Sequence, residues 1–107
     1  MSADELSRAV ELFARQVGHW GPARWAASAA GDGAASRADL VYGLVQRIAD
    51  RAAEAEGIPA RPVPRLDNDL ALPDQLRVVV TDLLLAGAEP PTLAAVAAEI
   101  AAVRDRL

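Results

Sequence analysis

The sequence predicts an all-α domain, a bundle of four or five helices with one long proline-rich connection at about residues 58–72. Three observations support this class. Apolar residues recur at three- and four-residue intervals in several segments, which is typical of helices with one buried face. No segment alternates apolar and polar residues in the way a half-buried strand does. Segments rich in glycine and proline separate the helical patterns, and 107 residues suit a single domain (residues 1–107) with one core.

The first helix is predicted to begin at Ser2 and to end before Gly18. Ser2 and Glu5 have the spacing of a capping box, in which two side chains bond the free N–H groups of the first helical turn. The apolar stripe that follows consists of Leu6, Ala9, Val10, Phe13, Ala14 and Val17. A short second helix is predicted from residue 22 to about residue 30, because the fixed φ angle of Pro22 suits a first helical turn.

The third helix has the clearest amphipathic pattern in the chain. Ser36, with Asp39 three positions later, is its expected N-cap. Its apolar stripe consists of Leu40, Val41, Leu44, Val45, Ile48, Ala49, Ala52 and Ala55. Gly57 is expected to end the helix, because glycine readily adopts the left-handed conformation found after a helix C-terminus.

The connection at residues 58–72 contains several prolines and an Asp-Asn-Asp turn, which exclude regular structure. Part of it has the pattern of an extended polyproline II segment. The apolar residues expected to lie over the bundle are Ile58, Val63 and Leu66. Arg61 and Arg65 stand on its edge, and long ordered connections often carry function. The connection is therefore a second candidate for a contact surface, with these two arginines in it.

The fourth helix, at about residues 73–86, carries large apolar residues on both sides. Leu76, Val79, Val80 and Leu83 share one side. Val78 and Leu85 project from the other, so this helix is either central in the fold or part of a subunit contact. A fifth helix follows Pro90 and Pro91, with the stripe Leu93, Val96, Ala97, Ile100, Val103 and Leu107. We expect the helices to pack largely against antiparallel neighbours.

The charged residues argue against several partners. All 11 cations are arginine, which together with the many alanines indicates a GC-rich, bacterial coding bias, and the net charge is −4. No basic surface is visible for nucleic acid, and no apolar run is long enough to span a membrane. The acidic start of the chain has no signal-peptide pattern, so we expect a cytoplasmic protein. On the first helix, Glu11 and Arg15 are spaced to pair with each other.

No arrangement of residues predicts catalysis or a cofactor. The chain has no cysteine, and His19 is its only histidine, with no nucleophile in a recognisable arrangement beside it. The segment Asp67, Asn68 and Asp69 lacks the alternating positions, the glycine and the distal glutamate of a calcium loop. The sequence therefore favours a non-enzymatic protein without a metal site.

Trp20, Arg24 and Trp25, next to His19, form the densest group of large side chains in an aromatic-poor chain. The favoured interpretation is that the indoles fill the core where the second helix crosses the first. The alternative is a small-ligand site, in which two indoles and a guanidinium bind an anion or a flat metabolite.

The leading functional hypothesis is a protein interaction or regulatory module that presents a face to another protein or to a second copy of itself. Three large apolar residues lie away from the apolar stripes of their helices, so the core of an isolated bundle does not account for them: Leu12, Val78 and Leu85. Together they would suit a dimer interface. The small-ligand site near Trp20, Arg24 and Trp25 is the alternative.

Overall fold

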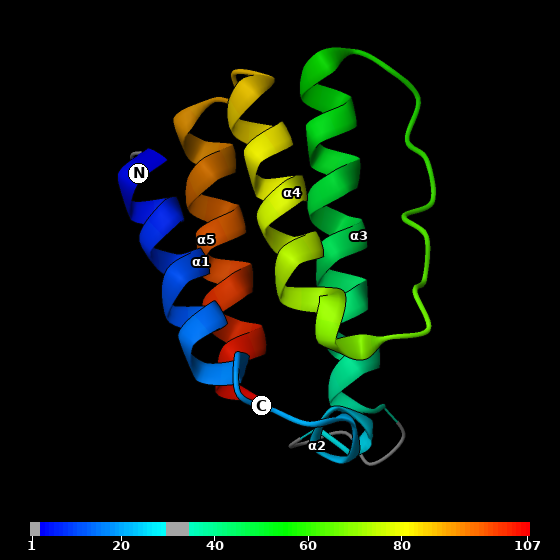
Figure 1. Ribbon diagram of the computed structural model, residues 1–107. Coiled ribbons are helices and arrows are strands. Elements are labelled where there is room, and N and C mark those ends of the chain that lie inside the picture. Colours follow the sequence, from blue (N-terminus) through cyan, green and yellow to red (C-terminus); the bar gives the residue numbers. More distant parts are fainter. Residues whose placement is uncertain (1–2, 30–34) are drawn as a thin grey trace.

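The computed structural model describes residues 3–29 and 35–107, and these residues contain helices and connections but no β-sheet. The helices are α1 (Ala3–Val17), α2 (Pro22–Ala26), α3 (Arg37–Glu56), the short 3-10 turn η1 (Asp69–Ala71), α4 (Leu72–Leu85) and α5 (Pro90–Asp105). Figure 1 shows the four long helices side by side as a bundle. The predicted all-α bundle is confirmed.

The directions of the long helices differ from the expected antiparallel packing. Helices α1 and α5 run one way, and α3 and α4 run the other (Figure 1). Contacts are most extensive between α3 and α4 and between α1 and α5, so the closest neighbours are parallel. The cause is the connection at residues 57–68, here called the strap, which returns along α3 before α4 begins (Figure 1). At about 3.1 Å per residue, an extended segment of this length covers the roughly 30 Å of α3.

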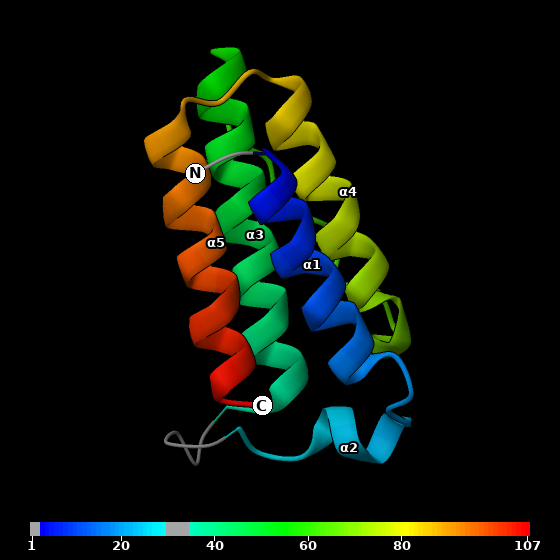
Figure 2. The same cartoon turned by 90° about the vertical axis from the view of Figure 1, so that its left-hand side faces the viewer.

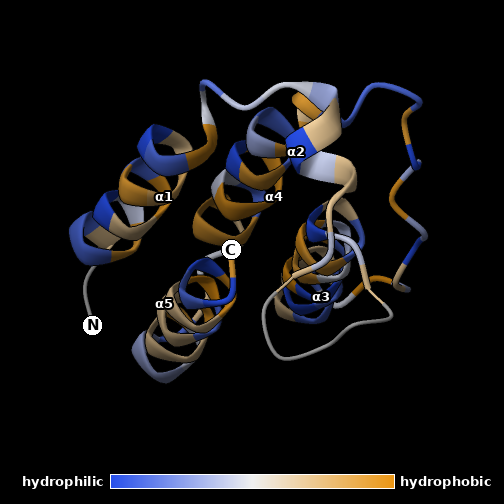
Figure 3. Cartoon of the chain, turned by 90° about the horizontal axis from the view of Figure 1, so that it is seen from below, coloured by the Kyte–Doolittle hydropathy of each residue, from blue (hydrophilic) through white to orange (hydrophobic). Residues whose placement is uncertain are grey.

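The core lies between the four long helices, whose apolar faces turn inward in the end-on view of Figure 3. Its fully buried side chains include Phe13, Leu44, Ile48, Leu76, Leu83 and Ile100. Each of these belongs to a predicted stripe and contributes on the order of 1.5–3 kcal/mol through its burial. Ala55 departs from the pattern because it is exposed in the last turn of α3.

The ends of α3 are formed as the sequence predicts. The Oγ atom of Ser36 accepts a hydrogen bond of 3.0 Å from the backbone N–H of Asp39. Gly57 has a φ angle of 73° at the other end, in the left-handed region that glycine enters without strain. Ser2, the expected N-cap of the first helix, lies outside the described residues.

The second helix is shorter than predicted, because α2 ends at Ala26 instead of near residue 30. The backbone that follows pairs with the chain leading into α3: Ala29 N donates to Ala35 O, and Arg37 N donates to Ala27 O. These bonds hold the backbone after α2 in an extended conformation that a longer helix would not allow. Figure 2 shows α2 lying across the end of the bundle where α1 finishes. The sequence also predicts that Gly31, Asp32 and Gly33 end this helix, and these three residues lie outside the described residues.

The strap contacts the bundle through fewer apolar side chains than expected. Val63 packs against the core, whereas Ile58 and Leu66 are exposed. Polar side chains of α3 contact the strap at this point: Tyr42 O–H donates to Val63 O, and Gln46 Oε1 accepts from Val63 N. The irregular segment is also shorter than predicted, since Asn68 caps η1 through a 3.0 Å bond from Leu70 N to its Oδ1.

Within residues 3–29 and 35–107, no helix combines the length and apolar content that a bilayer span requires.

Candidate functional site

The two tryptophans fill the end of the bundle beneath α2. Both indoles are buried, and their ring centroids lie 5.0 Å apart at an interplanar angle of 66°. This edge-to-face geometry is favourable for aromatic pairs. Trp20 and Trp25 therefore belong to the core, as the favoured interpretation predicts, but α2 packs mainly on α3 and η1 instead of crossing α1.

Two guanidinium groups stack on the ring of Trp20. The Cζ atom of Arg24 lies 4.8 Å from the ring centroid, and that of Arg37 lies 5.5 Å from it. Arg37 also donates to the backbone oxygens of Arg24, at 3.3 Å, and Leu107, at 3.2 Å. It thus joins α2, α3 and the end of α5. Sequence reasoning missed Arg37, because its distance along the chain from Trp20 gives no sign of the contact.

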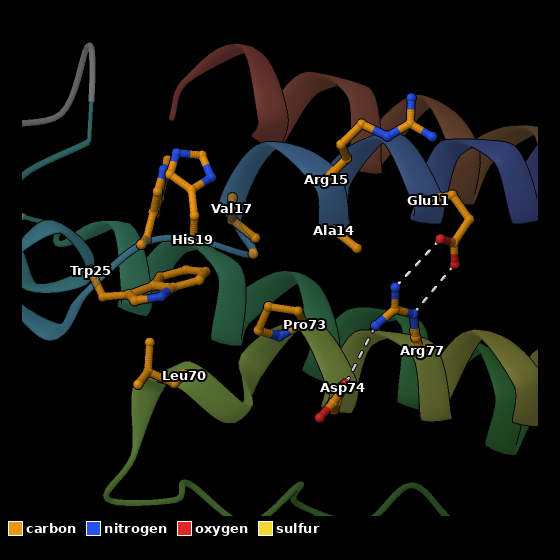
Figure 4. Close-up of a pocket in the computed structure, with 12 residues that line it drawn as sticks. Glu11, Ala14, Arg15, Val17, His19, Trp25, Leu70, Pro73, Asp74 and Arg77 are labelled. Carbon is orange, nitrogen blue, oxygen red and sulfur yellow. Dashed lines mark hydrogen bonds and ion pairs between the residues drawn. The ribbon is translucent and has the colours of Figure 1, made fainter.

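A hollow of about 580 Å³ adjoins the other side of this cluster, between the second half of α1 and the start of α4. We call it the α1–α4 hollow. His19, Trp20 and Trp25 line it, as do Leu70 and Pro73. Figure 4 shows Trp25 at one end of the hollow, with Leu70 and Pro73 along the α4 side. Three of the four predicted ligand-site residues therefore meet at a real depression.

The fourth, Arg24, does not line the α1–α4 hollow, since its guanidinium lies on Trp20. At the far end of the hollow, Arg77 of α4 bonds both carboxylate oxygens of Glu11 at 3.4 Å and Asp74 at 3.4 Å (Figure 4). Glu11 thus pairs across the bundle with Arg77, and no pair with Arg15 forms. An exposed pair on one helix is worth only a few tenths of a kcal/mol, so the cross-helix arrangement readily displaces it.

A second hollow, of about 320 Å³, lies between the strap and α4. Apolar side chains dominate its lining: Val63, Pro64, Leu66, Ala71, Val78 and Val79. We call these residues the strap face. Val78 remains 58% exposed and Leu66 45% exposed. Sequence reasoning singled out Val78 and placed Leu66 over the core, so it missed that the two share one surface.

The other predicted interface residues lie elsewhere. Leu12 is 41% exposed and lines a small separate hollow of about 100 Å³ between α1 and α5. Leu85 is 80% exposed in the last turn of α4. The structure therefore places Leu12 and Val78 in two different hollows.

Side chains of α3 and α4 hold the strap in place. Gln46 accepts from Val63 N at 2.7 Å and donates to Arg61 O at 3.0 Å, while Gln75 donates to Pro64 O at 3.0 Å. Arg65 pairs with Asp39 at 3.1 Å. The Arg65 guanidinium also pairs with Asp69 at 3.7 Å and stacks 4.8 Å from the centroid of the Tyr42 ring. Of the two predicted strap arginines, Arg65 thus fastens the strap, while the side chain of Arg61 is exposed.

The pKa of Asp39 reflects these contacts. Burial acts to raise the pKa of this carboxyl, but hydrogen bonds from Arg65 and Ser36, with the charge of Arg65, together hold it below its ordinary value of 3.8. The ionised form of Asp39 therefore supports both the cap of α3 and the strap.

Charge is unevenly distributed along the bundle. The end that holds the tryptophans carries the arginines Arg15, Arg24, Arg37 and Arg104, and also the acids Asp39 and Asp105. The opposite end carries the acids Asp4, Glu54, Glu56 and Glu89. In α3, Glu54 and Glu56 at the end of the helix oppose the helix dipole, whereas Asp39 in the first turn agrees with it.

Among the described residues, no three histidine or carboxylate side chains gather in a way that could hold a metal ion. No protein-family model matches the chain, and neither a curated protein nor a solved structure matches it. Function is therefore argued from geometry.

Proposed function

We propose that this chain is a non-enzymatic interaction module that associates with a second copy of itself through the strap face. The observation that carries the proposal is the pairing of exposed Leu66 and Val78 around one apolar hollow. Burying such half-exposed side chains is worth on the order of 1–2 kcal/mol each.

The rigidity of the strap supports this proposal. The bonds from Gln46 and Gln75 fix the backbone of the strap before any partner arrives. A surface that is already ordered loses less conformational entropy on binding than a flexible loop does. The strap face therefore has the properties of a preformed contact surface.

The shape of the strap face suits a two-fold contact. In such a contact each copy uses the same surface, so a side chain that protrudes from one copy must meet a hollow in that same surface of the other copy. Leu66 lines the strap side of the hollow and Val78 the α4 side. A two-fold contact would place Leu66 of each copy into the hollow of the other, with apolar surface against apolar surface.

Cysteine cross-linking tests this contact, and the natural absence of cysteine makes single-cysteine variants clean reporters. We expect Leu66→Cys to form a disulfide-linked dimer rapidly under mild oxidation at micromolar concentration. Ala102→Cys, at an exposed position of α5, is the matched control and should stay monomeric. Equal cross-linking of the two variants, or none in either, contradicts the proposal.

A further inference from the structure

We propose that the α1–α4 hollow binds a flat aromatic molecule that carries one anionic group. This hollow differs from the one at the strap face, although Asp74 lines both, and the proposal does not depend on self-association. The proposal rests on the size of the hollow, its aromatic and apolar walls, and one cation at its edge, Arg15, that has no partner in the described part of the chain.

The walls fit a flat, apolar body. A volume of about 580 Å³ is within the range of small-molecule sites, which is roughly 300–1,000 Å³. Trp25 closes one end of the hollow, and Leu70 and Pro73 form the α4 side (Figure 4). Ala14 of α1, with its small side chain, also lines the hollow and keeps it open. An aromatic ring here would contact an indole that the core already holds rigidly.

The charges favour an anion. Arg77 is bonded to both Glu11 and Asp74, so these three groups largely satisfy one another. Arg15 and His19 also line the hollow, and no ion pair or hydrogen bond of their side chains forms within residues 3–29 and 35–107.

The dipoles of the helices that end beside the hollow do not change its net charge. The negative end of α1 and the positive end of α4 both lie at the hollow and carry partial charges of opposite sign and similar size. Side chains therefore decide the local charge. The charged residues that line the hollow are Arg15, Arg77, Glu11 and Asp74, and Arg24 and Arg37 lie nearby on the ring of Trp20. Arg77 is already paired with both carboxylates, so Arg15 is the side chain that would hold an anion here.

The indoles supply an independent reason for a ligand at this place. The Nε1 atoms of Trp20 and Trp25 are buried, and neither has a hydrogen-bond acceptor in the described residues. A buried donor without an acceptor is costly. Both indoles line the hollow, so a ligand oxygen that reached either N–H after a small movement of the side chains around it would remove that cost.

Calorimetric titration with a matched set of probes tests the site. The probes are 1-naphthoate, 1-naphthyl phosphate and the uncharged 1-naphthamide, which share one ring system. We expect at least one of the two anions to bind with a dissociation constant below about 1 mM. We also expect that anion to bind at least fivefold more tightly than the amide. The carboxylate and phosphate arms identify which anionic group the site prefers.

Two variants locate the binding. Arg15→Gln should raise the dissociation constant of the anion about tenfold, as expected for the loss of a charged hydrogen bond. It should change the dissociation constant of the amide by less than twofold. Arg8→Gln, at an exposed position earlier on α1, is the control and should change neither. Ala14→Leu fills the hollow and should weaken all three probes, with circular dichroism used to verify folding. No binding of any probe, or anion affinity that Arg15→Gln leaves unchanged, overturns the proposal.

Discussion

The side-chain amide of Gln46 holds the backbone at Val63 much as a neighbouring β-strand would. Its oxygen accepts from Val63 N at 2.7 Å, and its nitrogen donates to Arg61 O at 3.0 Å. One amide of α3 thereby satisfies two backbone groups of a segment that has no secondary structure of its own. The position of the strap, and with it the strap face, depends on this contact.

Replacing Gln46 with alanine should therefore loosen the strap. We expect Gln46→Ala to lower the free energy of unfolding by about 1–3 kcal/mol, because Val63 N–H is then left without its acceptor. Urea denaturation measures this loss, and hydrogen exchange should accelerate at Val63. Gln16→Ala is the matched control, since Gln16 makes one exposed bond of 3.4 Å to Arg104 O. Unchanged exchange in the strap would mean that other contacts hold it.

The stack of Arg37 on Trp20 should stabilise the end of the bundle. Arg37→Met keeps most of the apolar stem but removes the cation and the bonds to Arg24 O and Leu107 O. We expect a loss of about 1–2 kcal/mol and a shifted tryptophan emission. Arg47→Met, at an exposed position of the same helix, should be nearly neutral. Equal effects of the two variants would show that the stack contributes nothing specific.

The lowered pKa of Asp39 predicts a definite pH dependence. A carboxyl whose pKa is lower in the folded chain stabilises the fold above its ordinary value of 3.8, and that contribution is lost as the pH falls through the folded value. Because the Asp39 side chain is more than half exposed, the contribution should stay below about 1 kcal/mol. Asp39→Asn should thus be less stable than wild type near pH 6, with the difference shrinking toward pH 2.5. If the difference in stability between Asp39→Asn and wild type did not vary with pH, ionisation of Asp39 would not be its cause.

The sequence was sufficient to predict the helices and the core, because these follow from local patterns. The stripe of α3, its cap at Ser36 and its end at Gly57 all lie within one helix or beside it. The parallel pairing of α3 with α4 was not predictable in this way, since a long connection is compatible with either direction. The strap that carries the chain back along α3 is bonded by Gln46 and Gln75, which only the folded chain brings to it.

In the candidate sites, too, the sequence predicts which neighbouring residues gather but not which distant residues join them. His19, Trp20 and Trp25 are near one another in the sequence and meet at the α1–α4 hollow. Arg77 and Arg37 join these surroundings from distant parts of the chain, and no local spacing marks them. Leu66 was expected over the core because it is apolar, but it is exposed, and Tyr42 and Gln46 are the α3 side chains that bond the strap at Val63.

Self-association through the strap face is tested most directly by the molar mass of the protein in solution. Light scattering behind size exclusion at micromolar concentration should give a dimer for wild type and a folded monomer for Val78→Glu, because a charge is tolerated there once the face meets water. Leu12→Glu should remain dimeric, since Leu12 lies in the separate hollow between α1 and α5. Ala102→Glu, which adds the same charge at an exposed position of α5, should also remain dimeric. A monomeric wild type, or a dimer that Val78→Glu leaves intact, would contradict the account.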